Sequence, residues 1–156
     1  MNIEEKVNAI INYILADTEQ EKESIISVLR KSDAANTGIK SVEKEIATIL
    51  CEIGLPENIK GHRYSVYAIK VAVKNPDIID AITKELYPTV AEKFNTTASR
   101  AERAIRHAIE CAWDRCDFEV VEKYFGSTIS KYKGKPTNSE FIARIANIVR
   151  HRVGNA

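Results

Sequence analysis

The side chains best suited to do chemistry gather just after a short polar turn in the second half of the chain. The turn is Asn95-Thr96-Thr97, and the ten residues that follow it contain Ser99, Arg100, Glu102, Arg103, Arg106 and His107. An arginine can donate a pair of hydrogen bonds to O6 and N7 of guanine, and a carboxylate can accept one from the amino group of cytosine. Such side chains near the start of a helix are typical of a recognition helix that reads base edges in the major groove.

The residues around this cluster predict a helix–turn–helix over residues 88–113. A short first helix over about 88–94 would turn Val90 and Phe94 inward, and Pro88 fits only its first turn or a break. Thr97 is well placed as the N-cap of a second helix, which we expect from about 98 to 115. The second helix has an apolar face formed by Ala101, Ala104, Ile105, Ala108, Ile109 and Ala112.

Other interpretations of the same cluster are weaker. The outer residues would also suit a solvated helix face on which Glu102 and Arg106 form an ordinary i,i+4 ion pair. His107 and Cys111 share a face, but a structural zinc site needs four ligands, so we expect Cys111 to be a core residue. His107 could be the phosphoacceptor of a phosphotransfer bundle, although a DNA-reading helix explains it better. We predict no metal, no cofactor and no enzyme, since the sequence shows no glycine-rich phosphate loop and no convincing catalytic constellation.

The rest of the chain predicts an all-α fold. Apolar residues recur at helical spacing over 3–15, and Thr18 opens a second helix that we expect through about residue 30. Residues 32–40 are small and polar and predict a linker. Further helices are expected from 41 to 53, from 64 to 75, over about 77–85, from an Asp117 cap to 124, and from a Thr137 capping box to about 151. Gly61 is expected to mark a turn.

Composition and charge bound the class of protein. The chain has 156 residues, of which 44% are hydrophobic and 29% charged, which is typical of one globular domain with a small accessory element. It has no apolar run of the ~20 residues that a membrane span needs, no signal-peptide pattern, and only three cysteines. We therefore expect a cytoplasmic protein that does not enter the membrane.

The near-neutral net charge of +1 hides a strong asymmetry along the chain. Residues 1–52 carry 6 basic and 10 acidic side chains, whereas residues 123–156 carry 7 basic and 1 acidic. A basic tail of this kind is typical of proteins that bind nucleic acid, although a solvated basic face would look the same. In this tail Lys131, Lys133 and Lys135 lie in a loop, where we expect them to contact phosphates rather than bases.

Long motifs in the chain resemble a known family. The stretch AITKELYPTVAEKFNTTASRAERAIRHAIECAWDR, with GLPENIKG before it and KPTNSEFIA after it, resembles the C-terminal effector domain of the sporulation regulator called stage-zero sporulation protein A. The resemblance covers about residues 45–152. It implies a six-helix domain that binds double-stranded promoter DNA. In that family the positions of Arg100, Glu102 and Arg103 read bases, and those of Ser99, Arg106 and His107 make backbone or auxiliary contacts. Ala98 and Cys116 depart from the proline and glycine that the family often has there.

The N-terminal residues depart furthest from that family. Residues 1–40 are too short for its phosphoacceptor domain and lack alternating strands, so we expect a helical hairpin and linker there, followed by the effector domain over 41–156. The stripe of Ile3, Val7, Ile10, Ile11, Ile14 and Leu15 is more than a free hairpin can bury. It would pack either on the third helix of the same chain or on a second copy, and we favour a homodimer. The alternative function is a regulator that titrates a partner protein through this hairpin.

Overall fold

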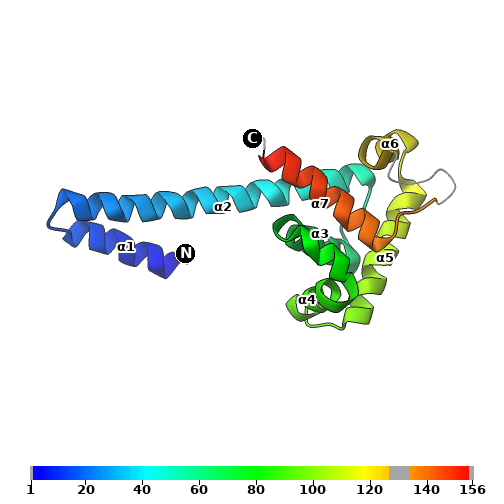
Figure 1. Ribbon diagram of the computed structural model, residues 1–156, viewed down its shortest axis with the longest axis horizontal. Coiled ribbons are helices and arrows are strands. Elements are labelled where there is room, and N and C mark those ends of the chain that lie inside the picture. Colours follow the sequence, from blue (N-terminus) through cyan, green and yellow to red (C-terminus); the bar gives the residue numbers. More distant parts are fainter. Residues whose placement is uncertain (1, 127–133, 155–156) are drawn as a thin grey trace. The chain divides into compact units, whose positions relative to one another are not determined.

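The computed structural model describes residues 2–126 and 134–154, and the regular elements in these two ranges are all helical (Figure 1). The predicted all-α fold class is therefore confirmed. The chain divides into two compact units, Met1–Ser41 and Val42–Ala156, which are called unit 1 and unit 2 below. None of the described helices is long and apolar enough to cross a membrane.

Unit 1 consists of a first helix and the N-terminal part of a second, and side chains cap the start of each helix. α1 spans Ile3–Leu15, and Asn2 and Glu5 cap its start reciprocally, with both N···O distances at 2.8 Å. α2 spans Glu19–Ile53, and Thr18 Oγ1 accepts from the backbone N–H of Glu21 at 3.2 Å. Lys6 Nζ lies 3.3 Å from Asp33 Oδ1, so α1 runs back along the N-terminal part of α2.

The prediction of a linker at residues 32–40 is wrong, because α2 continues through this segment into unit 2. Starting a helix is costly, but extending one is cheap. Gly38 costs only about 1 kcal/mol inside a helix, and the segment also contains alanines, which favour helix. A third helix therefore does not start at Ser41. The predicted end of this helix at residue 53 is confirmed, since α2 ends at Ile53 and Gly54 follows with φ +83°.

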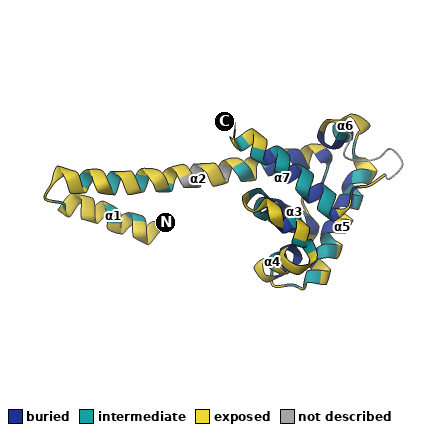
Figure 2. Cartoon of the chain, viewed as in Figure 1, coloured by how far each residue is buried: buried dark blue, intermediate teal, exposed yellow. Residues whose placement is uncertain are grey.

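Unit 2 contains the hydrophobic core (Figure 2). Its elements after α2 are α3 (Lys60–Lys74), a 3₁₀ helix η1 (Pro76–Ala81), a π-helical turn η2 (Ile82–Leu86), α4 (Tyr87–Lys93), α5 (Ala98–Arg115), α6 (Phe118–Phe125) and α7 (Asn138–Gly154). α3 packs against both α5 and α7. The aromatic rings of Trp113, Phe125 and Phe141 form one cluster, with centroids 5.1 Å apart for the first two.

Three local predictions for unit 2 need correction. Residues 77–85 form a 3₁₀ helix and a π turn instead of one α-helix. Asp117 occupies the N-cap position of α6, but its side chain makes no capping hydrogen bond. Gly61 is the second residue of α3 and marks no turn. A Cβ added to Gly61 would lie 2.1 Å from the carbonyl oxygen of Ala104, so the glycine allows α3 and α5 to approach closely.

Candidate nucleic-acid interface

α4 and α5 are joined by a tight turn whose backbone is fixed by hydrogen bonds. Pro88 lies in the first turn of α4, as predicted. Thr96 N donates to Ala91 O at 2.9 Å, and Asn95 adopts the left-handed conformation with φ +51°, which asparagine tolerates better than most residues. Thr97 Oγ1 accepts from Arg100 N at 3.2 Å, which confirms Thr97 as the N-cap of α5. The start of α5 is therefore held at a defined place relative to α4.

The inner face of α5 anchors this helix in the core. Ala101, Ile105, Ala108, Ile109 and Ala112 are at most 1% exposed, as their spacing predicts. Ala104 is only half-buried, but it lies directly under Gly61 of α3. The alanines on this face let the neighbouring helices pack closely on one side of α5 and leave the other side to the solvent.

The outer face of α5 carries the predicted cluster. Five of its six residues are exposed, and Glu102 is half-buried: Ser99, Arg100, Arg103, Arg106 and His107 make up the exposed group. At 3.6 residues per turn, Arg103 lies at the centre of this face, with Arg100 and His107 on one flank and Glu102 and Arg106 on the other. Within the described residues, the guanidinium groups of Arg100 and Arg103 have no protein partner.

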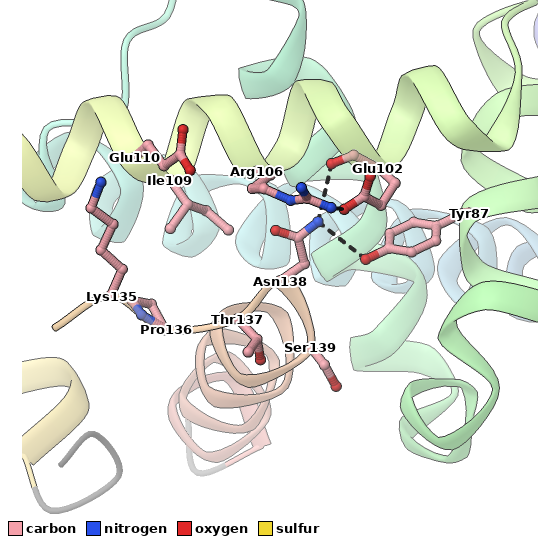
Figure 3. A pocket seen from close by; sticks show the side chains of 10 residues that line it. All are labelled: Tyr87, Glu102, Arg106, Ile109, Glu110, Lys135, Pro136, Thr137, Asn138 and Ser139. Carbon is pink, nitrogen blue, oxygen red and sulfur yellow. Dashed lines mark hydrogen bonds and ion pairs between the residues drawn. The ribbon is translucent and has the colours of Figure 1, made fainter. Parts of the chain in front are cut away.

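Glu102 and Arg106 form the i,i+4 ion pair that the sequence allows. The side chain of Arg106 is 60% exposed and that of Glu102 only 23%. Figure 3 shows both side chains beside Tyr87 of α4 and Asn138 of α7. The structure thus places Glu102 toward α7 and away from Arg100 and Arg103.

Asn138 connects the helix–turn–helix to α7, and the sequence analysis missed this role. Its Nδ2 donates to Tyr87 Oη and to the backbone oxygen of Glu102, both at 3.1 Å (Figure 3). Burial raises the pKa of the Tyr87 hydroxyl, and the hydrogen bond from Asn138 opposes this shift. One signal was available: Thr137 already caps α7, which leaves an asparagine at the first helical position without a capping role.

A shallow cavity of about 380 Å³ opens beside this network (Figure 3). Its lining includes Arg106, Glu110, Lys135 and Thr137. Lys135 Nζ lies 3.8 Å from Asp114 Oδ1, and Gly134 O accepts from Trp113 Nε1 at 2.9 Å. The end of the basic loop is therefore attached to α5. Lys131 and Lys133, the other two predicted phosphate contacts, lie outside the described residues.

The cysteines and His107 form only a local contact. Cys111 Sγ lies 3.6 Å from His107 Nε2, one turn further along α5. Cys111 is half-buried, and Cys116 is the C-cap of α5, where burial raises the pKa of its thiol. Within residues 2–126 and 134–154, no three histidine, cysteine or acidic side chains come together as metal ligands would.

A short helix, a fixed turn and a longer helix with an exposed basic face define the helix–turn–helix class of DNA-binding domains. The profile of the family described as "Sporulation initiation factor Spo0A C terminal" matches residues 46–149, within unit 2. The chain belongs to this family, as its motifs indicated. The family comprises the DNA-binding effector domains of sporulation regulators and is not a family of enzymes. Its match does not include α1 or residues 19–45 of α2.

Proposed function

We propose that this chain is a sequence-specific regulator of transcription that acts in the cytoplasm and reads double-stranded DNA through α5. The observation that carries the proposal is the pair of exposed guanidinium groups of Arg100 and Arg103, on a helix whose start is fixed by Thr97. Each guanidinium can fork onto one guanine. In this proposal Ser99, Arg106 and His107 contact the DNA backbone beside these bases.

Glu102 has a conditional role in this proposal. Its carboxylate is the partner of Arg106 in the free protein. A DNA phosphate near Arg106 would compete for that guanidinium and leave the carboxylate able to accept from a cytosine amino group. Glu102 therefore reads a base only when Arg106 turns to the DNA backbone.

The test compares two arginines on the same helix. The protein first selects preferred duplexes from a random pool, and scrambled versions of the best one serve as the non-specific probe. We expect Arg103→Ala to lose about 1–3 kcal/mol of binding free energy on the selected duplex and much less on the scrambled one. Arg115→Ala removes the same charge at the other end of α5 and is the matched control. An equal loss on both duplexes would make Arg103 a phosphate contact.

We also propose that Lys131, Lys133 and Lys135 contact phosphates. Lysine acts as a compact point charge with little base specificity, and Lys135 is exposed beside α5. Replacing all three with alanine is expected to flatten the slope of log affinity against log salt by about 2–3, at ~0.9 per lost contact. An unchanged slope would show that the loop is merely solvated.

Unit 1 favours a homodimer as the form that binds DNA. Lys6 and Tyr13 of α1 contact α2, while Ile3, Ile14 and Leu15 are 70–81% exposed. α2 therefore leaves most of the surface of these three stripe residues uncovered. Residues 1–41 carry 5 basic and 7 acidic side chains, so little net charge opposes the pairing of two copies. A two-fold axis would bring the same stripe of each copy together.

Light scattering on the full chain tests this pairing. We expect a dimer for the wild type and a monomer for Ile14→Glu, because an ionised carboxylate at the interface would be desolvated. Asn12→Glu adds the same charge on an exposed polar position of α1 and should remain dimeric. A monomeric wild type would overturn the dimer and favour the alternative function, titration of a partner protein through the same stripe.

A further inference from the structure

Among the described residues only two polar side chains, those of Ser65 and Asn138, are buried, and Asn138 has 8% of its surface exposed. Its side-chain nitrogen carries two N–H groups, and both have an acceptor: Tyr87 Oη and Glu102 O, each at 3.1 Å. Tyr87 lies 51 residues before Asn138 and Glu102 lies 36 residues before it. One amide group thus joins α7 to two helices, α4 and α5, that lie far before it in the sequence.

The start of α7 does not need this asparagine for its own stability. Thr137 Oγ1 already accepts from Glu140 N at 3.2 Å, which is the capping bond of α7. The Asn138 side chain is directed sideways to α4 and α5 (Figure 3). A buried primary amide is costly unless it is hydrogen-bonded. The hydrogen bonds to Tyr87 Oη and Glu102 O therefore explain why a buried asparagine is tolerated here.

The two acceptors belong to the two helices of the helix–turn–helix. Tyr87 begins α4, and the Glu102 carbonyl lies in the second turn of α5, next to Arg103 in the sequence. A bond to that carbonyl fixes the rotation of α5 about its own axis. This rotation decides where the guanidinium groups of Arg100 and Arg103 point.

The same segment is attached to α5 further along. Gly134 O accepts from Trp113 Nε1 at 2.9 Å, and Lys135 pairs with Asp114 at 3.8 Å. Residues 134–138 therefore follow α5 over three turns, with Asn138 at the end nearer the predicted base readers. A phosphate contact by Lys135 and base contacts by Arg103 would then keep a fixed spacing.

We propose that Asn138 is a positioning residue for DNA reading: it holds α4 and α5 in the orientation in which Arg100 and Arg103 reach base edges together. The inference rests on the proposed function, because it assigns Asn138 a part in sequence discrimination by α5. It touches no DNA itself.

The test measures the ratio of affinities for the selected duplex and its scrambled version, by fluorescence anisotropy with the full chain. We expect Asn138→Ala to lower this ratio about tenfold and to change the affinity for the scrambled duplex by less than about twofold. Val149→Ala removes a buried apolar group from the same helix and controls for loss of stability. We expect Val149→Ala to keep the wild-type ratio.

Tyr87→Phe keeps the inference testable if Asn138→Ala fails to fold. It removes one acceptor and leaves the bond to Glu102 O, so the ratio should fall about threefold. The deciding comparison is between the ratio for Asn138→Ala and that for Val149→Ala, with Tyr87→Phe taking the place of Asn138→Ala if the latter does not fold. If these two ratios are equal while the wild type discriminates between the duplexes, the inference is overturned and the proposed function stands. A wild-type ratio of one overturns both.

Discussion

α1 in unit 1 and α5 in unit 2 are both amphipathic helices, but they differ in what covers their apolar faces. The six aliphatic residues of the α1 stripe are 46–81% exposed, and no residue of α1 is buried. On α5, five apolar residues are at most 1% exposed. Helical periodicity therefore predicts which face is apolar, whereas the covering partner depends on contacts that are remote in the sequence.

The glycines of the two units show the same contrast. Gly61 lies where an added Cβ would collide with the backbone of Ala104, while a Cβ on Gly38 would have nothing within 4 Å. Both glycines lie inside helices. The local sequence gives no reason to treat them differently, and only the packing of α3 on α5 separates them.

The largest expected effect comes from truncating the buried face of α5. Ile105→Ala should lower the free energy of unfolding of unit 2 by about 2–5 kcal/mol, because it leaves a cavity at a fully buried site. Ile14→Ala, at a position 71% exposed, should change the same transition by less than ~0.5 kcal/mol. Urea unfolding followed by the fluorescence of Trp113, the single tryptophan, reports unit 2. Equal losses for both variants would mean that α1 is part of the core of unit 2.

The next largest effect on stability is expected from substituting Gly61 and Gly38. Gly61→Ala should destabilise unit 2 by about 1–3 kcal/mol, because α3 must move away from the backbone of α5. The better helix propensity of alanine offsets only part of this cost. Gly38→Ala meets open space and should stabilise α2 by about 0.5–1 kcal/mol. Thermal unfolding of both variants by circular dichroism checks the signs, and a Gly61→Ala variant as stable as the wild type would contradict the close approach.

Much of the helix–turn–helix could be predicted because its signals are local. The Thr97 cap, the place of Pro88 and the buried face of α5 depend on residues within a few positions of one another. The i,i+4 geometry of Glu102 and Arg106 was also available from the sequence, as an alternative to base reading. The structure contains that ion pair, so the base reading proposed for Glu102 requires the ion pair to break.

What the sequence could not predict depends on cooperativity or on distant contacts. The continuous helix through residues 32–40 follows from cheap helix extension between two strong flanks, which a residue-by-residue reading underestimates. The role of Gly61 depends on Ala104, and that of Asn138 on Tyr87 and Glu102. These partners are 36–51 residues away for Asn138, beyond the range of any local pattern.

A smaller effect is expected from the caps of the two units. Thr97→Ala should destabilise unit 2 by about 1 kcal/mol, because the N–H of Arg100 loses its acceptor. Thr18→Ala removes a bond of the same kind, at the same 3.2 Å, from the start of α2 in unit 1. The urea transition of Trp113 fluorescence should shift for the first variant and stay in place for the second. A shift of similar size for Thr18→Ala would show that the two units unfold together.

The smallest expected effect concerns the pH dependence of unit 2. Hydrogen bonds from Tyr124 and Lys123 lower the pKa of Glu52 below its ordinary value of 4.5. A carboxyl group with a lowered pKa in the folded state stabilises the protein fully above about pH 4.5, and this contribution is lost as the pH falls through the lowered pKa. Glu52→Gln should therefore be less stable than the wild type near neutral pH, with a difference that shrinks below pH 4.5. Glu19→Gln, whose ion pair with Lys22 lies in unit 1, is the matched control. Urea unfolding of Trp113 at a series of pH values measures the difference, and one that stayed constant with pH would mean that the charge of Glu52 does not stabilise unit 2.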